Sequence, residues 1–439
     1  MATVHENRDC DRLDEHAAPP FLRRVRIRDY KSIAFCDVRL APLTILVGRN
    51  GTGKSNFLDA LAFLRDLMEM RAAEAVNERK GWRSIHCRNG STRHIAMGFE
   101  ATFESFQSTW DADYVFALEI ANQNQIRVQQ ESLILSQHGK DRRCGYQISD
   151  GKLDWIGEEH FADEDVPRST SGDKLLNPGL FARRRYDRLL LSIIGTQPFL
   201  DLAERLRASC VYTISPAAIR VHQPMTAGPV LLRDGSNLAR AIEGLREIEP
   251  ETIQRISTYL SAIVPDVSTF DVVEYGDFET VRFHLKGTGG QEPPEFDASS
   301  MSDGTLRTLA TLVAAFQIVL PGGFPGFIGI EEPETSLHPA AMRALVDALD
   351  EATGRTQVLL TTHSAEFLDN PTIGPDSVRV VEMIDGKTII TPVDEASREI
   401  VCRKLNTLGE LERQDRLEMD PDDVERQQRL SRSAQGPAA

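Results

Sequence analysis

Nine consecutive residues, GRNGTGKSN from Gly48 to Asn56, have the types and the spacing that bind phosphate groups. They fit the pattern G-x-x-x-x-G-K-[ST], with Gly48, Gly53, Lys54 and Ser55 at its defining positions. Glycines let main-chain N–H groups turn inward around a phosphate, and the following helix adds the positive end of its dipole. In such a loop the lysine reaches the β- and γ-phosphates, and the serine hydroxyl ligates Mg²⁺. The loop predicts a nucleotide site, and its other members are Asn50, Gly51, Thr52 and Asn56.

Two adjacent carboxylates, Glu331 and Glu332, follow an apolar run in FIGIEEPETSLHP. We expect this run to form a strand beside the strand that precedes the phosphate loop, in a parallel sheet whose carboxyl ends collect ligands. One carboxylate can then support the Mg²⁺ shell while the other orients and deprotonates the attacking water. The alternative interpretation is a pair of helix-capping glutamates before Pro333.

Two more segments place polar residues where an anion could bind. SSMSDGTLRTLATLVAAF has Ser302 and Gly304 at the start of an apolar helix, where main-chain N–H groups attract negative charge. QVLLTTHSAEFLD ends a buried strand with Thr361, Thr362 and His363. Taken singly, the first is an ordinary helix cap and the second is a structural or solvated histidine. Along the chain the order is phosphate loop, serine-glycine helix, strand with two acids and strand with histidine. This order makes the functional interpretations of the four segments support one another.

Hydrophobic periodicity indicates the elements that must position these residues. In FLRRVRIRDYKSIAFCDVRLAPLTILVG, the alternation in RRVRIR and CDVRL predicts two strands before the strand that leads into the phosphate loop. A helix is expected from Ser55 to about Glu74. The runs HIAMGFEATF, DYVFALEIA, QIRVQQESLIL and CGYQIS predict an antiparallel sheet that flanks the site.

The later part of the chain alternates between helical and hairpin patterns. LFARRRYDRLLLSIIG, PFLDLAERLRASC and LARAIEGLREIEPETIQRISTYLSAIVP have the periodicity of helices. Two hairpins are expected, one turning near Gly276 and Asp277 and one at Asp385 and Gly386.

Composition limits the function classes. With 439 residues and 41% hydrophobic content, the chain can build two or three domains around buried cores. The formal net charge of −16 argues against a protein that coats nucleic acid through its overall field, so any DNA contact must be a local patch. The six cysteines lie far apart without a C-x-x-C pair, which predicts reduced thiols. A polar N-terminus and a longest apolar stretch of only Ala310–Leu320 predict neither a secretion signal nor a membrane span, and hence a cytoplasmic protein.

Two basic segments are candidates for contact with DNA phosphates. The first is residues 77–94, and the second is residues 183–188 on an expected helix. A solvated surface is the alternative interpretation for both. The cations are Arg79, Lys80, Arg83, Arg88 and Arg93 in the first segment, and Arg183, Arg184, Arg185 and Arg188 in the second.

At these motifs the chain resembles the ABC-type ATPases of the SMC/RecF/OLD class, in particular the RecF-like ATPases. The matching segments are RIRDYKS, GRNGTGKSN as Walker A, MSDGT as the ABC signature, FIGIEEPETSLHP as Walker B with the D-loop, and TTHS with the switch histidine. SPAAIR and LLRDGSNLARAI are similar but less diagnostic. The resemblance implies an α/β P-loop NTPase of ABC type, with a mixed central sheet, a flanking antiparallel β lobe and an inserted helical arm.

The resemblance also implies a set of residue roles. In that family the signature serine contacts the γ-phosphate bound by the opposite subunit, which implies a homodimer with two ATP molecules between the subunits. The implied roles are phosphate and Mg²⁺ binding for Lys54 and Ser55, metal support for Glu331, the general base for Glu332, γ-phosphate sensing for His363, and contact with the partner's nucleotide for Ser302 and Gly304.

Some positions depart from the family pattern. Arg49 stands where proline is common, Asp29 where asparagine is common, and Glu331 where many members have aspartate. The Q-loop glutamine is left open among four residues, which are Gln129, Gln130, Gln137 and Gln147.

The resemblance divides the chain into five expected segments. They are a disordered lead-in (1–20), the N-terminal ATPase part (21–156), the helical arm (157–265), the C-terminal ATPase part (266–400) and a polar helical tail (401–439). Because only about 75 residues follow His363, no TOPRIM nuclease is expected within the chain. The implied function is an ATP-driven switch that acts on DNA or on a separately encoded effector such as a nuclease, in bacterial DNA repair or antiviral defence. The alternatives are an ATP-locked binding scaffold with slow or dispensable hydrolysis and, third, a small-molecule kinase.

Overall fold

A computed structural model of the chain describes residues 20–432, except for 89, 91–92, 122–124, 150–151, 158–186, 288–292 and 318–323. The expected lead-in and the cations Arg183, Arg184 and Arg185 therefore lie outside the described residues. Within the described ranges, no helix is both long and apolar enough to cross a membrane. The division into five segments stays a prediction.

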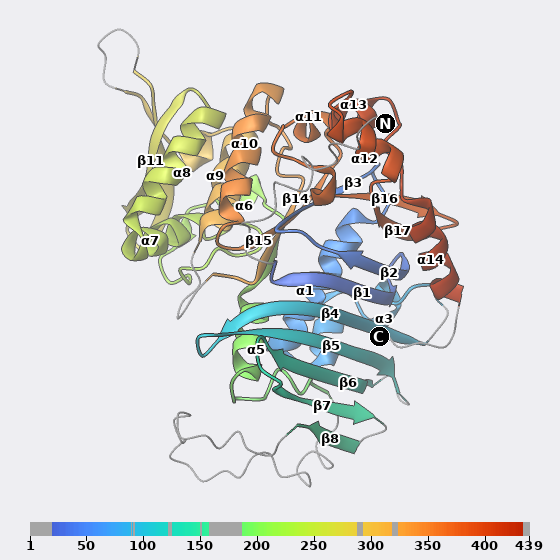
Figure 1. Ribbon diagram of the computed structural model, residues 1–439. Coiled ribbons are helices and arrows are strands. Elements are labelled where there is room, and N and C mark those ends of the chain that lie inside the picture. Colours follow the sequence, from blue (N-terminus) through green and yellow to red (C-terminus); the bar gives the residue numbers. More distant parts are fainter. Residues whose placement is uncertain are drawn as a thin grey trace.

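The lower half of the molecule in Figure 1 is a seven-stranded antiparallel sheet, here called sheet A, which confirms the predicted β lobe. Its strand order is β2-β1-β4-β5-β6-β7-β8. The strands are β1 (Leu22–Tyr30), β2 (Ile33–Arg39), β4 (His94–Ser105), β5 (Ser108–Ile120), β6 (Ile126–Gln137), β7 (Arg143–Ser149) and β8 (Lys152–Ile156).

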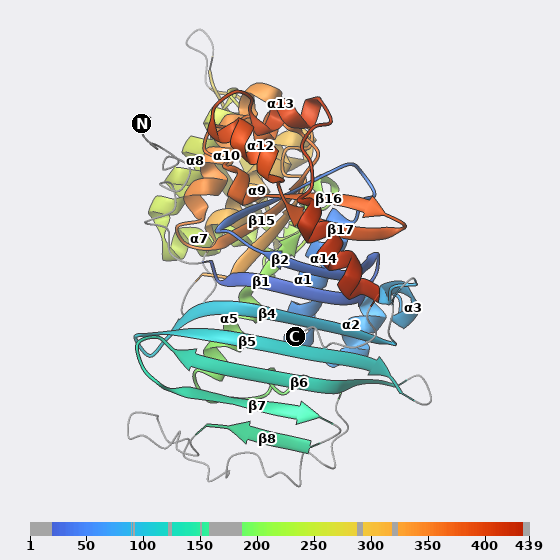
Figure 2. The ribbon, with the colours of Figure 1, turned by 45° about the vertical axis from the view of Figure 1, so that its right-hand side comes forward.

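The alternation of RRVRIR distributes side chains between the two faces of β1. Val25 and Ile27 lie in the hydrophobic core, whereas the arginines between them lie on the opposite face. Helix α14 (Pro421–Arg432) packs against β2 on that face, as Figure 2 shows, and the main-chain oxygen of Leu430 accepts a hydrogen bond from Arg28. The predicted strand is confirmed, and the C-terminal helix covers its polar side.

Sheet B is mixed and has the strand order β17-β16-β3-β15-β14-β9. All its neighbours are parallel except β17, which forms the predicted hairpin with β16 around Asp385 and Gly386. The prediction that the Glu331 strand lies beside the phosphate-loop strand is wrong, because β15 lies between them. Strand order depends on how the crossover helices pack, which the local sequence pattern does not encode. The strands are β3 (Leu43–Val47), β9 (Cys210–Tyr212), β14 (Phe327–Glu331), β15 (Gln357–Thr362), β16 (Val378–Ile384) and β17 (Lys387–Pro392).

Both faces of sheet B are covered. Leu46 lies in a core shared with sheet A and helix α1 (Lys54–Glu69), whereas its neighbours Ile45 and Val47 lie in a second core. The second core contains α7 (Leu238–Ile248), α8 (Pro250–Ile263), α9 (Asp303–Phe316) and α10 (Pro339–Ala352). Helices α1 and α9 therefore lie on opposite faces of sheet B, and together the sheets and helices confirm the expected α/β class (Figure 1).

A small third sheet lies beside the second core. It consists of β10 (Gln223–Pro224), β11 (Val267–Tyr275), β12 (Phe278–Leu285) and β13 (Glu295–Asp297), and its β11–β12 hairpin turns at Gly276 and Asp277 as predicted. The short η3 (Ala298–Ser300) leads from this sheet towards α9, and η4 (Pro375–Ser377) precedes β16. The remaining helices are α2 (Ala72–Glu78), α3 (Trp82–Ile85), α5 (Phe199–Ala208), α6 (Pro216–Ile219), α11 (Ala365–Leu368), α12 (Glu395–Cys402) and α13 (Leu408–Arg413).

Three local predictions need correction. The first helix ends at Glu69 rather than near Glu74, because Met70 is extended and a new helix starts at Ala72. Residues 187–195 form turns rather than the end of a helix, because their leucines are buried by packing beneath sheet A. Cys402 is disulfide-bonded rather than reduced, since cysteine spacing alone does not show which thiols the fold brings together. Cys36, Cys87, Cys144 and Cys210 form no disulfide, as predicted.

Candidate nucleotide site

Three segments that are distant in the sequence meet at the carboxyl edge of sheet B. In the parallel registers, Thr362 pairs with Val47, and Glu331 pairs with Thr361. The phosphate loop after Val47, the acid pair and His363 therefore leave neighbouring strands side by side. This edge is where parallel α/β sheets bind ligands.

The phosphate loop is closed around its own lysine. Lys54 is 5% exposed, and its Nζ donates hydrogen bonds to the main-chain oxygens of Gly48 and Arg49. Burial lowers the pKa of this lysine, while the nearby carboxylates Glu332 and Glu334 act in the opposite direction. Ser55 is exposed at the start of α1, so its hydroxyl is accessible to a ligand.

Residues outside the loop fix its shape. The Asn56 side chain donates to Ser32 Oγ (2.6 Å), which lies 2.6 Å from Thr388 Oγ1. Thr388 Oγ1 in turn donates to the main-chain oxygen of Thr52 at 2.7 Å. A Cβ on Gly53 would lie 2.0 Å from Thr388 Oγ1, so this position accepts only glycine. The contribution of Thr388 was missed, because the sequence carries no signal that links it to residues more than 300 positions away.

Glu332 and His363 face each other at this edge. Glu332 Oε1 lies 3.4 Å from His363 Nδ1, and both side chains are partly exposed. Glu332 has a φ of 44°, a left-handed conformation that is rare for residues other than glycine, and its N–H donates to the main-chain oxygen of Thr361 at 3.1 Å. Such outliers occur where the surrounding fold constrains a functional side chain.

The two predicted metal-binding residues offer oxygen atoms, which suit a hard cation. Ser55 provides a hydroxyl, and Glu331 provides a carboxylate that accepts a hydrogen bond from Thr213 at 3.4 Å. Among the described residues, no group of three or more His, Cys, Asp or Glu side chains could hold a metal ion. This donor set fits Mg²⁺, which is usually bound through one or two protein ligands together with phosphate oxygens and water.

A third carboxylate, Glu334, was missed by the sequence analysis. It is 4% exposed, and its Oε1 accepts a hydrogen bond from Thr362 Oγ1 at 2.5 Å. Its Oε2 is buried and has no hydrogen-bond partner among the described residues, and burial raises the pKa of the carboxyl group. The only sequence signal was its position two residues after Glu332 in the acidic motif.

The serine-glycine segment caps α9. Ser302 Oγ accepts a hydrogen bond from the N–H of Thr305 at 3.2 Å, so the N-cap interpretation is confirmed. A Cβ on Gly304 would lie 2.5 Å from the main-chain oxygen of Ser336, so the segment packs tightly against the turn after Glu332. Arg220 of SPAAIR fixes the segment by pairing with Asp303 and by donating to the main-chain oxygen of Met301 at 2.9 Å.

Comparison with known proteins decides the family. A family model described as "AAA domain, putative AbiEii toxin, Type IV TA system" matches residues 43–369, a span that includes every predicted site residue. The chain belongs to this AAA-domain family. No curated protein matches the chain.

Solved structures of SMC head domains are similar to this AAA-domain protein at low identity. An SmcHead bound to the C-winged helix domain of ScpA has 13% identity and a TM-score of 0.47, covering 87% of this chain and 100% of that one. The SMC head domain from Thermotoga maritima has 13% identity and a TM-score of 0.41, covering 85% and 99%. An Smc head with an extended coiled coil, bound to the C-terminal domain of ScpA derived from Pyrococcus furiosus, has 12% identity and a TM-score of 0.46, covering 88% and 99%.

Helix α13 of the AAA-domain protein and the residues that follow it reach the phosphate loop. Asp415 accepts hydrogen bonds from Arg49 through both carboxylate oxygens at 2.8 Å, and Glu412 is half-buried near Lys54 with a pKa that burial raises. Arg413 pairs with Asp369 at 2.7 Å, next to α11. These contacts were missed, because the sequence analysis interpreted this segment only as a polar tail.

The remaining predicted residues lie away from the site edge. Three Q-loop candidates, Gln129, Gln130 and Gln137, lie on β6, and the fourth, Gln147, lies on β7. In sheet A both strands are separated from β1 by β4 and β5. Arg79 is not a DNA contact, since it is nearly buried between Asp59 (3.3 Å) and Asp66 (2.8 Å). Arg188 donates to the main-chain oxygen of Glu69 at 3.3 Å. The exposed cations of the first basic segment are Lys80, Arg83, Arg88 and Arg93, and none forms an ion pair within the described part of the chain.

Proposed function

We propose that this AAA-domain protein is a switch that binds and hydrolyses ATP. The observation that carries the proposal is the 3.4 Å approach of Glu332 Oε1 to His363 Nδ1 at the edge where the phosphate loop begins. A carboxylate and an imidazole at that position match a general base and a residue that contacts the γ-phosphate. Belonging to an AAA-domain family supports nucleotide binding by the same loop.

In the proposed reaction, Lys54 exchanges its two main-chain oxygen partners for phosphate oxygens. Glu332 accepts a proton from the attacking water, and His363 orients the γ-phosphate. Ser55 and Glu331 would hold Mg²⁺, which neutralises phosphate charge when it is bound. Thr388 and Ser32 maintain the shape of the loop during this exchange.

The proposed active unit is a homodimer with two nucleotides between its subunits. Helices α1 and α9 lie on opposite faces of sheet B, so Lys54 and Ser302 start helices that belong to different layers of one subunit. A second subunit can bring its own Ser302 and Gly304 to the nucleotide that Lys54 binds. Each site is then complete only in the dimer.

The switch is proposed to act on DNA or on a separately encoded effector such as a nuclease, in the bacterial cytoplasm. The unpaired cations Arg83, Arg88 and Arg93 support a local contact with phosphates in a chain of net charge −16. The description of the family names a putative toxin of a Type IV TA system, which supports action on a separate target. Antiviral defence and DNA repair are both proposed settings.

Light scattering coupled to size-exclusion chromatography tests the proposal. Glu332→Gln should form a dimer in ATP and a monomer without it, because ATP stays bound when the base is absent. Lys54→Ala should remain monomeric in both conditions, and this variant is the matched control. A wild-type chain that forms the ATP dimer but has no measurable hydrolysis would favour the binding-scaffold alternative. A Glu332→Gln chain that stays monomeric at saturating ATP would contradict the dimer.

A further inference from the structure

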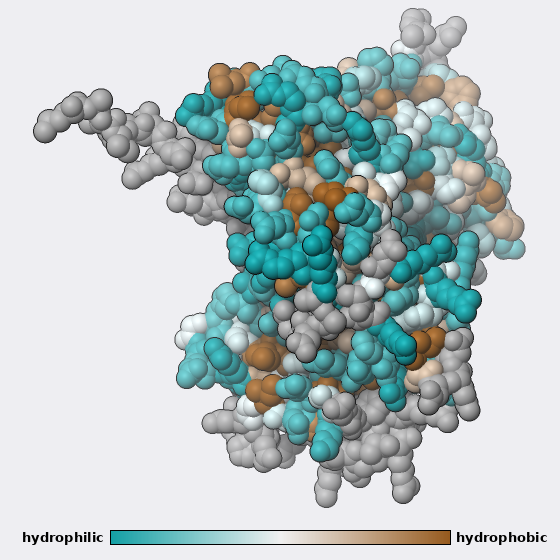
Figure 3. All heavy atoms as spheres, turned by 90° about the vertical axis from the view of Figure 1, so that its right-hand side faces the viewer, coloured by the Kyte–Doolittle hydropathy of each residue, from teal (hydrophilic) through white to brown (hydrophobic). Residues whose placement is uncertain are grey.

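A polar crevice separates the C-terminal elements from sheet A, on the face of the molecule shown in Figure 3, where hydrophilic residues predominate. Its volume is about 600 Å³, and it is lined by residues of β1, β2, η4, β16, β17, α12 and α14. We call it the arginine crevice, after Arg24, Arg39, Arg379, Arg398 and Arg426 in its lining. It contains none of the residues of the candidate nucleotide site.

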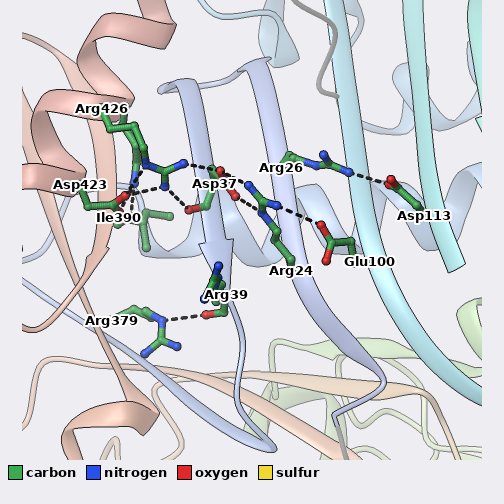
Figure 4. A network of polar contacts seen from close by, with 11 residues as sticks. Arg24, Arg26, Asp37, Arg39, Glu100, Asp113, Arg379, Ile390, Asp423 and Arg426 are labelled. Carbon is green, nitrogen blue, oxygen red and sulfur yellow. Dashed lines mark hydrogen bonds and ion pairs between the residues drawn. The ribbon is translucent and has the colours of Figure 1, made fainter. Parts of the chain in front are cut away.

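Three of these arginines are neutralised by carboxylates, as Figure 4 shows for the pairs around Asp37. Arg24 and Arg426 each approach Asp37 to 2.6 Å, and Arg426 also pairs with Asp423. Arg398 pairs with Asp376 at 2.6 Å. The pairs of Asp37 join α14 to sheet A, and the pair of Arg398 joins α12 to η4, so these charges stabilise the packing of the fold.

Arg379 is different, because its guanidinium contacts only main-chain oxygens. The residue is 8% exposed, and its Nε donates to the oxygen of Arg39 at 2.8 Å, while Nη1 donates to those of Asp376 (2.7 Å) and Val378 (2.8 Å). Its Nη2 has no hydrogen-bond partner among the described residues, and no carboxylate there lies within 4.0 Å of the guanidinium. Burial lowers the pKa of Arg379 to about 10, so the group remains charged at neutral pH. Asp376 and Asp423 attract this charge from a distance, but neither carboxylate contacts the guanidinium, so a bound anion could supply the direct partner that it lacks.

Arg39 provides a second cation in the lining of the same crevice. Its main-chain oxygen contacts Arg379 directly, and its side chain lies between Arg379 and Asp37 in Figure 4. It is exposed and forms no ion pair with any described residue. Guanidinium groups present N–H donors in a planar fork that matches phosphate oxygens, so two such forks in one crevice suit an oxyanion with two negative charges.

We propose that the arginine crevice binds a small phosphate monoester, with the phosphate between Arg39 and Arg379. A phosphate monoester has a charge of about −1.5 to −2 at pH 7 and can pair with both of these guanidinium groups. The five arginines of the lining face five aspartates, which are Asp37, Asp376, Asp420, Asp422 and Asp423, so the attraction comes from the two arginines locally and not from a net charge of the crevice. A volume of about 600 Å³ exceeds what a phosphate alone fills and falls within the range of small-molecule sites. Asp422, which lines the crevice without an ion pair in the described part of the chain, can accept hydrogen bonds from hydroxyl groups of the ligand.

Calorimetric titration of the full-length wild-type chain with ribose 5-phosphate, in excess ADP to occupy the phosphate loop, tests this proposal. We expect one site per chain that binds ribose 5-phosphate more tightly than inorganic phosphate, because the hydroxyls add contacts. Arg39→Ala should weaken binding by about tenfold or more, the loss typical of one charge-assisted hydrogen bond. Arg127→Ala, which removes an exposed arginine of β6 far from the crevice, is the matched control and should bind like the wild type.

Arg379→Met should abolish binding, and circular dichroism and thermal melting would show whether this buried substitution leaves the fold intact. If it does not, Arg39→Ala decides the outcome, since that side chain is exposed and has no ion pair within the described residues. The proposal is overturned if the wild type binds neither probe in excess ADP, or if Arg39→Ala binds ribose 5-phosphate as tightly as the wild type. Loss of ATP hydrolysis in any of these variants has no bearing on the result, so the two proposals fail separately.

Discussion

Glu332 and His363 are 31 positions apart in the sequence, yet Glu332 Oε1 lies 3.4 Å from His363 Nδ1 at the ends of two neighbouring parallel strands. The left-handed conformation of Glu332 and its main-chain contact with Thr361 fix this approach. If Glu332 is the base and His363 binds the phosphate, as proposed, this distance lets them act on the same water and the same phosphate. The pair is therefore the structural basis of the proposed hydrolysis.

Replacing His363 by alanine should lower the turnover of ATP while leaving ATP binding intact. The imidazole is expected to stabilise charge that develops in the transition state, and removal of one such donor typically lowers kcat by about 10²–10³-fold. Steady-state hydrolysis and equilibrium binding of a fluorescent ATP analogue measure the two effects. His138→Ala, on the far side of sheet A, is the control and should change neither. Equal turnover of ATP in His363→Ala and wild type would contradict the proposed role of His363 in hydrolysis.

Docking of α14 should depend on pH through Asp37. Burial would raise the pKa of Asp37, but hydrogen bonds from Arg24 and Arg426 outweigh burial and hold this pKa below its usual value of 3.8. A lowered pKa in the folded state contributes stability above the unfolded pKa, and this stability is lost as the pH falls through the folded value. Asp37→Asn should destabilise the protein by about 3 kcal/mol at pH 7, the cost typical of breaking a buried pair.

Thermal melting at several pH values measures this effect. The difference in melting temperature between wild type and Asp37→Asn should be greatest near pH 7 and should shrink once the pH falls below about 3.8. Asp154→Asn, an exposed position on β8, is the control and should melt like the wild type throughout. A difference that is constant with pH would show that the charge of Asp37 does not stabilise the contact with α14.

Any DNA affinity should depend on the exposed arginines of the first basic segment. Reversing the charge of Arg83 and Arg88 together should weaken binding and lower the slope of log K against log salt by about 2, since each lost phosphate contact removes about 0.9. Fluorescence anisotropy with labelled duplex DNA at several salt concentrations measures both quantities. The matched control reverses Lys140 and Arg143, which are exposed around the turn between β6 and β7, at the opposite end of the strands from His94. If the two double mutants bind DNA identically, Arg83 and Arg88 do not contact DNA, and the interpretation of this segment as a solvated surface is correct.

Two inactive subunits should restore each other if the nucleotide sites are composite. Lys54→Ala removes the phosphate contact of one site, and Ser302→Arg removes the contribution to the partner's site, so a mixed dimer retains one intact site. Hydrolysis should approach half the wild-type rate per mixed dimer if the sites act independently, and should be lower if they are cooperative. Differently tagged chains verify subunit exchange. Lys54→Ala mixed with the Lys54→Ala/Ser302→Arg double mutant is the control and should stay inactive. Full activity from a strictly monomeric wild type would contradict the shared site.

The sequence predicted the parts of the site that depend on local pattern. The phosphate loop, the acid pair and His363 each follow an apolar strand, and the fold brings these three segments to one edge of sheet B. The order of the strands was beyond prediction, because it depends on helix packing rather than on the strands themselves. The same limit applies to Thr388, which contacts Ser32 across 356 positions, and to Arg79, whose charge looked free until the fold placed Asp59 and Asp66 beside it.

Single-turnover hydrolysis of ATP by Glu332→Gln tests the central claim most directly. Glutamine keeps the size of the side chain but cannot accept the proton of the attacking water, so the rate should fall by at least about a hundredfold while ATP binding is preserved. Glu425→Gln, at an exposed position of α14, is the matched control and should hydrolyse ATP at the wild-type rate. A rate in Glu332→Gln equal to that of the wild type, with ATP bound equally well, would contradict the assignment of Glu332 as the base.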